Sequence, residues 1–246
     1  MKRAARAPDS KVPVWATLVR VAGIYRSEFR LLFSIGLGVG IPIGLVQVLL
    51  DRLDLADPSA TQAATALGAA LAGFGFVLFA GQLYEGVVGN IAAFVQKGER
   101  RPKLRRVLRS LPLGRLIAAN FIYVFGTLIG LLLLIVPGVI LFALYAPAIT
   151  LISLERLSVR SAFARSRALV KGNFWRVLLV VGIGYLVASE LDLLLGVLES
   201  LTVGNSFAAD WAVEALSTAL LTPIAGVTAV VVTLRLIEID RAARSV

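Results

Sequence analysis

The sequence predicts an all-α integral membrane protein, a bundle of six transmembrane helices. Hydrophobic residues make up 58% of the 246-residue chain. Charged residues make up only 16%, against about a quarter in a typical soluble domain. Six apolar segments have roughly the 20-residue length that a helix needs to cross a bilayer core. The positive charges are divided by side: 24 of the 25 Lys and Arg residues fall on one predicted face of the membrane, and only Arg52 on the other.

The predicted spans form one membrane domain (31–240), between a basic amphipathic N-terminal segment (1–30) and a short tail (241–246). Val136-Pro137-Gly138 separates the third and fourth spans. It predicts a tight reversal, because proline lacks an N–H group and glycine tolerates a turn. The predicted spans are 31–50, 65–94, 114–136, 138–155, 174–197 and 212–237.

The distribution of Lys and Arg predicts the orientation. Cytoplasmic loops collect positive residues, whereas translocated loops do not. Both termini are therefore expected on the cytoplasmic side of the membrane. The first long apolar run follows a long basic segment, so we expect an uncleaved anchor and no cleaved signal peptide.

Three basic segments have the apolar spacing of amphipathic helices: the N-terminal segment, Pro102–Pro112 and Ser158–Lys171. Such helices suit the bilayer interface, where anionic headgroups attract Lys and Arg. A solvated face or a lid on the bundle is an equally good reading of each segment alone. The three copies also suggest three repeated helix-hairpin units. The candidate lipid-binding residues are Arg105, Arg106, Arg109, Arg160, Arg165 and Arg167.

Glycines at four-residue spacing predict where spans touch. Gly36, Gly40 and Gly44 lie along the first span, and Gly126 with Gly130 repeats the pattern on the third. Small residues let two helix backbones approach closely, which is a main source of helix association in lipid. We therefore expect helix packing at all five positions, with close approach of a ligand as the alternative.

Glu85 is the residue whose placement in the predicted membrane region costs the most free energy. Gln82 lies one turn earlier on the same face. An intramembrane carboxyl group needs a partner or a proton. The candidate partners are Arg235 on the last span and Arg115 or Asn120 on the third. The set is either a proton or cation site or a buried ion pair that fixes helix register.

Composition limits the chemistry. The chain has no Cys and no His, which excludes disulfides, thiolate chemistry and the commonest proton shuttle and metal ligand. No nucleophile triad, metal-ligand spacing or phosphate loop is present, so we expect no enzyme, cofactor or metal. The net charge is +10, and the basic clusters that produce it lie beside apolar segments. This placement favours anionic lipid over nucleic acid as the partner.

Residues 137–177 carry a Pro-Gly pair, a proline-broken span that ends in glutamate, and an Ala-rich helix with Ser166. The motif Gly172-Asn173-x-Trp175-Arg176 then precedes the fifth span. This stretch resembles the glycerophosphoryl diester phosphodiesterase membrane-domain family of bacterial membrane proteins. The resemblance implies a membrane module without the catalytic domain, because the family's activity resides in a separate soluble barrel that uses His and a metal.

These observations together predict a non-enzymatic membrane protein whose basic amphipathic helices engage anionic lipids or organise a membrane partner, either another protein or a second copy of the chain. The alternative is a transporter or permease component with Glu85 at its polar site. Asn173 is the predicted N-cap of the fifth span, because its side chain can accept a bond from the first turn.

Overall fold

The computed structural model describes residues 11–51, 84–91, 109–202 and 206–245, and these ranges contain helices and no strand. Four helices are long and apolar enough to span a membrane, which indicates a membrane protein. They are α2 (Phe29–Asp51), α6 (Ile135–Glu155), α8 (Phe174–Thr202) and α9 (Phe207–Arg244).

Two predicted spans are not among these four. The described apolar part of α5 (Leu113–Leu133) is shorter than a spanning helix requires. The predicted span 65–94 lies outside the described residues except for the helical segment 84–91. The number of crossings therefore stays a prediction.

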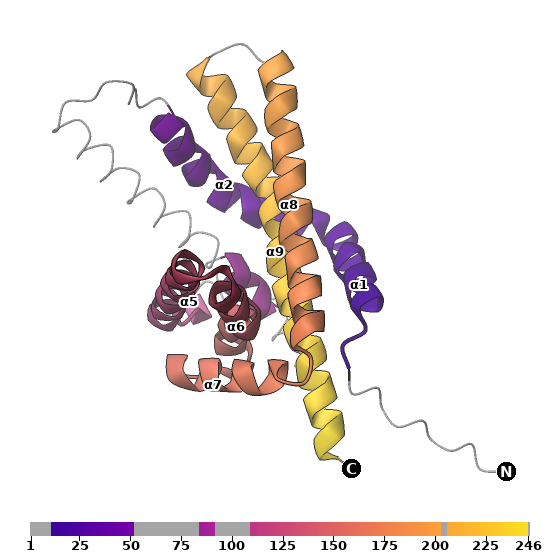
Figure 1. Ribbon diagram of the computed structural model, residues 1–246. Helices are drawn as coiled ribbons and strands as arrows, with labels where there is room; N and C mark the ends of the chain where they lie inside the picture. The colour runs from indigo at the N-terminus through magenta and orange to yellow at the C-terminus, as the bar shows by residue number, and fades with distance from the viewer. Residues whose placement is uncertain (1–10, 52–83, 92–108, 203–205, 246) are drawn as a thin grey trace.

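Helix α9 is the element around which the other helices gather. It packs against α1 (Val14–Ser27), α2, α6, α7 (Val159–Val170) and α8. Figure 1 shows α8 and α9 as a long antiparallel pair, with α7 running crosswise beside its lower end, below α5 and α6. A Cβ atom added to Gly184 of α8 would lie 2.8 Å from the Oγ1 atom of Thr228 on α9, so the Thr228 side chain packs against the backbone of α8.

The first glycine series packs against α9. A Cβ atom on Gly36 would lie 2.5 Å from the carbonyl oxygen of Ala219, and one on Gly40 would lie 2.5 Å from that of Ala215. A Cβ atom on Gly44 would lie 2.8 Å from the backbone nitrogen of Ala215. Real Cβ atoms do not tolerate such distances, so only glycine fits. We call this contact the glycine seam, defined by these five residues.

The turn between α5 and α6 differs from the prediction. The chain reverses at Leu134, which is extended (φ −160°, ψ 134°), and not at Val136-Pro137-Gly138. Pro137 instead lies in the first turn of α6, where a helix has no acceptor for the backbone N–H and proline is tolerated. Gly138 packs against Gly130, whose added Cβ would lie 2.9 Å from the Gly138 Cα.

The second glycine pair is thus divided. Gly130 makes a close helix contact, but a Cβ on Gly126 would have no neighbour within 4 Å among the described residues. The expected packing at Gly126 is therefore corrected to open space. Figure 1 also shows the α5–α6 hairpin steeply inclined to the α8–α9 pair, unlike a bundle of parallel spans.

Helix α1 packs against the bundle through one narrow face. Thr17 and Val21 are buried, while Trp15 is 78% exposed and Val19 is also exposed. The hydroxyl of Tyr25 donates to the carbonyl oxygen of Leu220 on α9, at 2.8 Å. The helix therefore both packs on α9 and presents apolar side chains outward. The predicted threefold repeat stays a prediction, because most of Pro102–Pro112 lies outside the described residues.

Candidate functional site

Glu85 lies in an enclosed part of the described structure. Residues 84–90 are all buried, and the Glu85 side chain accepts a hydrogen bond from the Thr150 hydroxyl of α6, with Oγ1 2.7 Å from Oε1. Tyr84 is fully buried beside Gly226 of α9, whose added Cβ would lie 3.0 Å from the Tyr84 ring. The segment is therefore held between α6 and α9.

The structure gives the predicted partners of Glu85 other contacts. Arg235 pairs with Glu238 at 2.9 Å, and Arg115 donates to the carbonyl oxygen of Arg156 at 3.0 Å. Asn120 is buried on α5, whereas Gln82 lies outside the described residues. Because Glu85 forms no ion pair within the described ranges, the expected pairing with Arg235 or Arg115 is corrected to the hydrogen bond from Thr150.

Two further polar groups lie on the elements that hold Glu85. Ser153 is fully buried on α6, with its Oγ atom 3.7 Å from the position of an added Cβ on Gly86 and on Gly89. Within the described part of the chain, neither this hydroxyl nor the Nδ2 group of Asn90 has a hydrogen-bond partner. These groups have unused hydrogen-bonding capacity for a polar ligand or water. No group of three acidic side chains able to hold a metal occurs in the described ranges.

Arg156 ends α6 and joins it to two other segments. Its backbone is left-handed, with φ 57°, and its guanidinium donates to the Oδ1 atom of Asn90 at 3.1 Å and to the carbonyl oxygen of Ser110. Sequence analysis did not single out this residue. A basic residue directly after an apolar helix is the available signal, because such residues bind unpaired helix carbonyls, but it does not identify Asn90 as the partner.

Helix α7 was predicted as a basic amphipathic helix, and its bounds fall within the predicted segment. The Ser158 hydroxyl caps its first turn by accepting from the N–H of Ser161, at 3.3 Å. Ser166 is buried, and its hydroxyl donates to the carbonyl oxygen of Leu144 in the middle of α6, at 2.7 Å. One side of α7 is thus fixed to α6.

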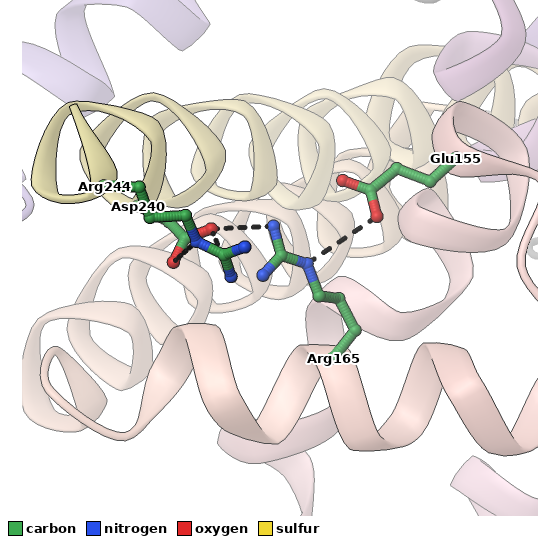
Figure 2. Close-up of polar contacts among 4 residues, drawn as sticks. All are labelled: Glu155, Arg165, Asp240 and Arg244. Atoms are coloured by element: carbon green, nitrogen blue, oxygen red, sulfur yellow. Dashed lines mark hydrogen bonds and ion pairs between the residues drawn. The ribbon is translucent and has the colours of Figure 1, made fainter.

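A chain of ion pairs fastens the same side of α7 to α9 (Figure 2). Arg165 lies 2.8 Å from a carboxylate oxygen of Asp240 and 3.7 Å from one of Glu155. Arg244 also pairs with Asp240, at 3.2 Å. The alternating charges join the end of α6, the middle of α7 and the end of α9, so we call this set the end clamp.

The candidate lipid-binding arginines therefore divide into different environments. Arg165 faces inward, with 23% of its side chain exposed, and belongs to the end clamp. Arg160 and Arg167 are exposed on α7 together with Lys171, and none of the three forms an ion pair within the described residues. Arg109 is also exposed, whereas Arg105 and Arg106 lie outside the described ranges.

The residues before α8 hold the N-terminal segment. Val12 is fully buried; its N–H donates to the Oδ1 atom of Asn173 at 2.8 Å, and its carbonyl oxygen accepts from Arg176 at 3.1 Å. Asn173 does stand at the start of α8, where its carbonyl accepts from Arg176 and Val177. Its side-chain Oδ1 atom, however, accepts from the N–H of Val12 in the N-terminal segment. Val12, α7 and the end of α9 therefore lie at the same end of the molecule.

Comparison with known proteins gives no match: no family model fits the chain, and no curated protein or solved structure is similar to it. The resemblance of residues 137–177 to a membrane-domain family stays a prediction.

Proposed function

We propose that the chain is a non-enzymatic, multi-span protein of the bacterial inner membrane that binds anionic phospholipids through the outward face of α7. Both termini and α7 are assigned to the cytoplasmic side. The observation that carries the proposal is the division of charge on α7: Arg165 is tied inward by Asp240 and Glu155, while Arg160, Arg167 and Lys171 face outward unpaired within the described structure.

Electrostatics supports this assignment. Each Lys or Arg near an anionic leaflet contributes about 1 kcal/mol of membrane attraction. A rigidly held helix also loses little conformational entropy when its side chains bind headgroups, because the end clamp and the Ser166 hydrogen bond already position it. The outward basic face of α7 is therefore organised before lipid arrives.

Helix α1 supports an interfacial location for this end of the protein. Trp15 and Val19 are exposed beside Arg20, which pairs with Glu238 of α9 at 3.6 Å. Tryptophan is enriched where membrane and water meet, because its ring is amphipathic. An exposed apolar face on a helix with basic neighbours suits headgroups better than bulk water.

The test is lipid selectivity in nanodiscs of mixed anionic and zwitterionic phospholipid. We expect the protein to enrich the anionic lipid, and the enrichment to fall as salt screens the charges. The double variant Arg167→Gln/Lys171→Gln should lose most of the enrichment. The matched control, Arg30→Gln/Arg241→Gln, removes the same charge from two other exposed positions and should retain it. Equal loss in both doubles, or none in either, contradicts the assignment to α7.

A second candidate function rests on Glu85. Its carboxyl group is buried and accepts a hydrogen bond from Thr150. It has no ion-pair partner in the described ranges. The Ser153 hydroxyl lies on α6, the same helix as Thr150. We propose, as the alternative, a transporter or permease component in which this carboxyl binds a proton, a cation or a polar substrate.

Flux measurements in proteoliposomes test the second candidate. Glu85→Gln preserves the size of the side chain and an acceptor for Thr150. If the variant assembles normally but loses a proton- or cation-dependent flux, the transport function is supported. If the wild-type protein shows no such flux, or if assembly and flux fall together, Glu85 has a structural role.

A further inference from the structure

A largely apolar groove lies between α5, α6 and α7. Its volume is about 510 Å³, within the roughly 300–1,000 Å³ typical of ligand pockets. We call it the α7 groove, and it is lined by Ile122, Tyr123, Gly126, Thr127, Leu141, Tyr145, Val159, Arg160 and Phe163. It adjoins the proposed lipid-binding face but consists of different side chains, apart from Arg160.

The missing side chain of Gly126 helps to form the groove. Unlike Gly130, which touches the backbone of Gly138, Gly126 has open space where a Cβ would stand. The ring of Phe163 packs edge-on against that of Tyr145 at 4.8 Å between centroids and forms part of the wall. The walls are thus mainly hydrocarbon and aromatic carbon, which favour an apolar occupant.

Polar groups in the groove have unused hydrogen-bonding capacity. Within the described structure, the Thr127 hydroxyl is buried without a hydrogen-bond partner and the Tyr145 hydroxyl forms no hydrogen bond. Arg160 is exposed and lines the groove, so the groove reaches the surface at a guanidinium that forms no ion pair with the described residues. It stands in the first turn of α7, where the helix dipole adds positive potential.

We infer that the α7 groove holds one acyl chain of an anionic phospholipid, with the headgroup phosphate on Arg160. This inference rests on the proposed function and deepens it, because it names one bound lipid where the outward face would only select a lipid class. Charge, polarity and apolar surface match such a molecule: the hydrocarbon tail fits the groove wall, its ester carbonyl oxygens are acceptors for the Thr127 and Tyr145 hydroxyls, and its anion fits the arginine at the mouth.

The experiment uses the full chain in zwitterionic nanodiscs that contain a trace of phosphatidylglycerol with a photoreactive group in its acyl chain. Cross-linked peptides are then mapped by mass spectrometry. We expect cross-links at residues 122–127 and 141–145. Gly126→Leu fills the groove from α5 and should lower their yield about tenfold, which corresponds to about a tenfold loss of affinity at subsaturating probe.

Two controls separate blocking from misfolding. Gly182→Leu makes the same change on α8, where a Cβ also has open space, and should leave the yield unchanged. Thr127→Leu fills the groove at the adjacent position and should lower it. Equal yields in wild type and both filled variants, or cross-links confined to other helices, overturn the inference.

Arg160 tests the headgroup. Arg160→Gln should lower phosphatidylglycerol cross-linking severalfold, whereas Arg167→Gln, outside the groove, should not. If a photoreactive free fatty acid labels the groove and phosphatidylglycerol does not, the phospholipid assignment is wrong. The proposed function is tested separately by Arg167→Gln/Lys171→Gln. If this double variant loses the bulk anionic enrichment but keeps the groove cross-links, both proposals are supported. If the wild-type protein forms the groove cross-links without enriching anionic lipid, the groove alone is supported.

Discussion

The glycine seam and the α7 region are fastened by different kinds of contact. In the seam, α2 meets α9 backbone to backbone, because Gly36, Gly40 and Gly44 leave no side chain between them. In the α7 region, Arg165 and Ser166 hold the helix through ion pairs and a hydrogen bond, and the adjacent groove remains open. The seam suits a permanent scaffold, and the α7 region suits a surface that binds something.

This difference also separates Gly40 of the first glycine series from Gly126 of the second. Both series have four-residue spacing, and Gly130 packs closely as the first series does, yet Gly40 faces a backbone oxygen at 2.5 Å and Gly126 faces open space. The same local pattern therefore supports a helix contact in one place and a cavity in the other. What decides between them is the partner helix, which the pattern does not contain.

The largest expected effect comes from breaking the seam. Gly40→Leu should destabilise the protein by about 3 kcal/mol, because the side chain must displace the backbone of Ala215. Unfolding by SDS in mixed micelles measures this change. Gly38→Leu is the matched control on the same helix: its Cβ meets no atom within 4 Å, so little loss is expected. Equal losses would mean that the seam does not hold α2 against α9.

A buried polar contact should come next. Thr150→Val keeps the shape of the side chain but removes the donor to Glu85, at a cost of about 2 kcal/mol for a buried group left unpaired. Thr150→Ser retains the hydroxyl and should recover most of the stability in the same SDS titration. If valine and serine are equivalent, the hydrogen bond contributes little to stability.

The end clamp should contribute less, because water screens its charges. Arg165→Gln removes the pairs with Asp240 and Glu155, whose side chains are 25% and 28% exposed, and should cost about 1 kcal/mol. High salt should reduce the difference from wild type. Arg167→Gln on the outward face is the control and should leave stability unchanged. A salt-independent loss would contradict the electrostatic account of α7 docking.

The smallest effect is expected on α1. Arg20 and Glu238 lie 3.6 Å apart with side chains 40% and 49% exposed, and such pairs contribute about 0.5 kcal/mol or less. Arg20→Gln should therefore be nearly silent in the same titration. A loss as large as that of Arg165→Gln would show that side-chain exposure does not decide how much each ion pair contributes to stability.

Much of the architecture could be predicted from local patterns. The apolar runs predicted the four helices long enough to span a membrane, and α7 falls inside the predicted Ser158–Lys171 segment. Boundaries set by single residues were less predictable: Pro137 was read as part of a turn but lies in the first turn of α6, because proline is tolerated in both places.

The polar site was predictable only in part. Burial of Glu85 followed from its position in an apolar segment, but its partner did not, because Thr150 is distant in sequence and threonine is common in membrane helices. In the sequence, Arg165 does not differ from its basic neighbours on α7; only its ion pairs with Asp240 and Glu155 distinguish it. Local sequence predicts which residues are polar and which are apolar, whereas the pairing depends on the tertiary arrangement.

The most direct test of the account asks which side of the membrane α7 occupies. The chain has no Cys, so single cysteines can be introduced and labelled with a membrane-impermeant maleimide. Ala168 is exposed on α7, and Ala208 is exposed at the opposite end of the α8–α9 pair. We predict that Ala168→Cys reacts only in inside-out vesicles and Ala208→Cys only in intact spheroplasts. Labelling of Ala168→Cys from the outside would contradict the cytoplasmic lipid-binding surface and the function built on it.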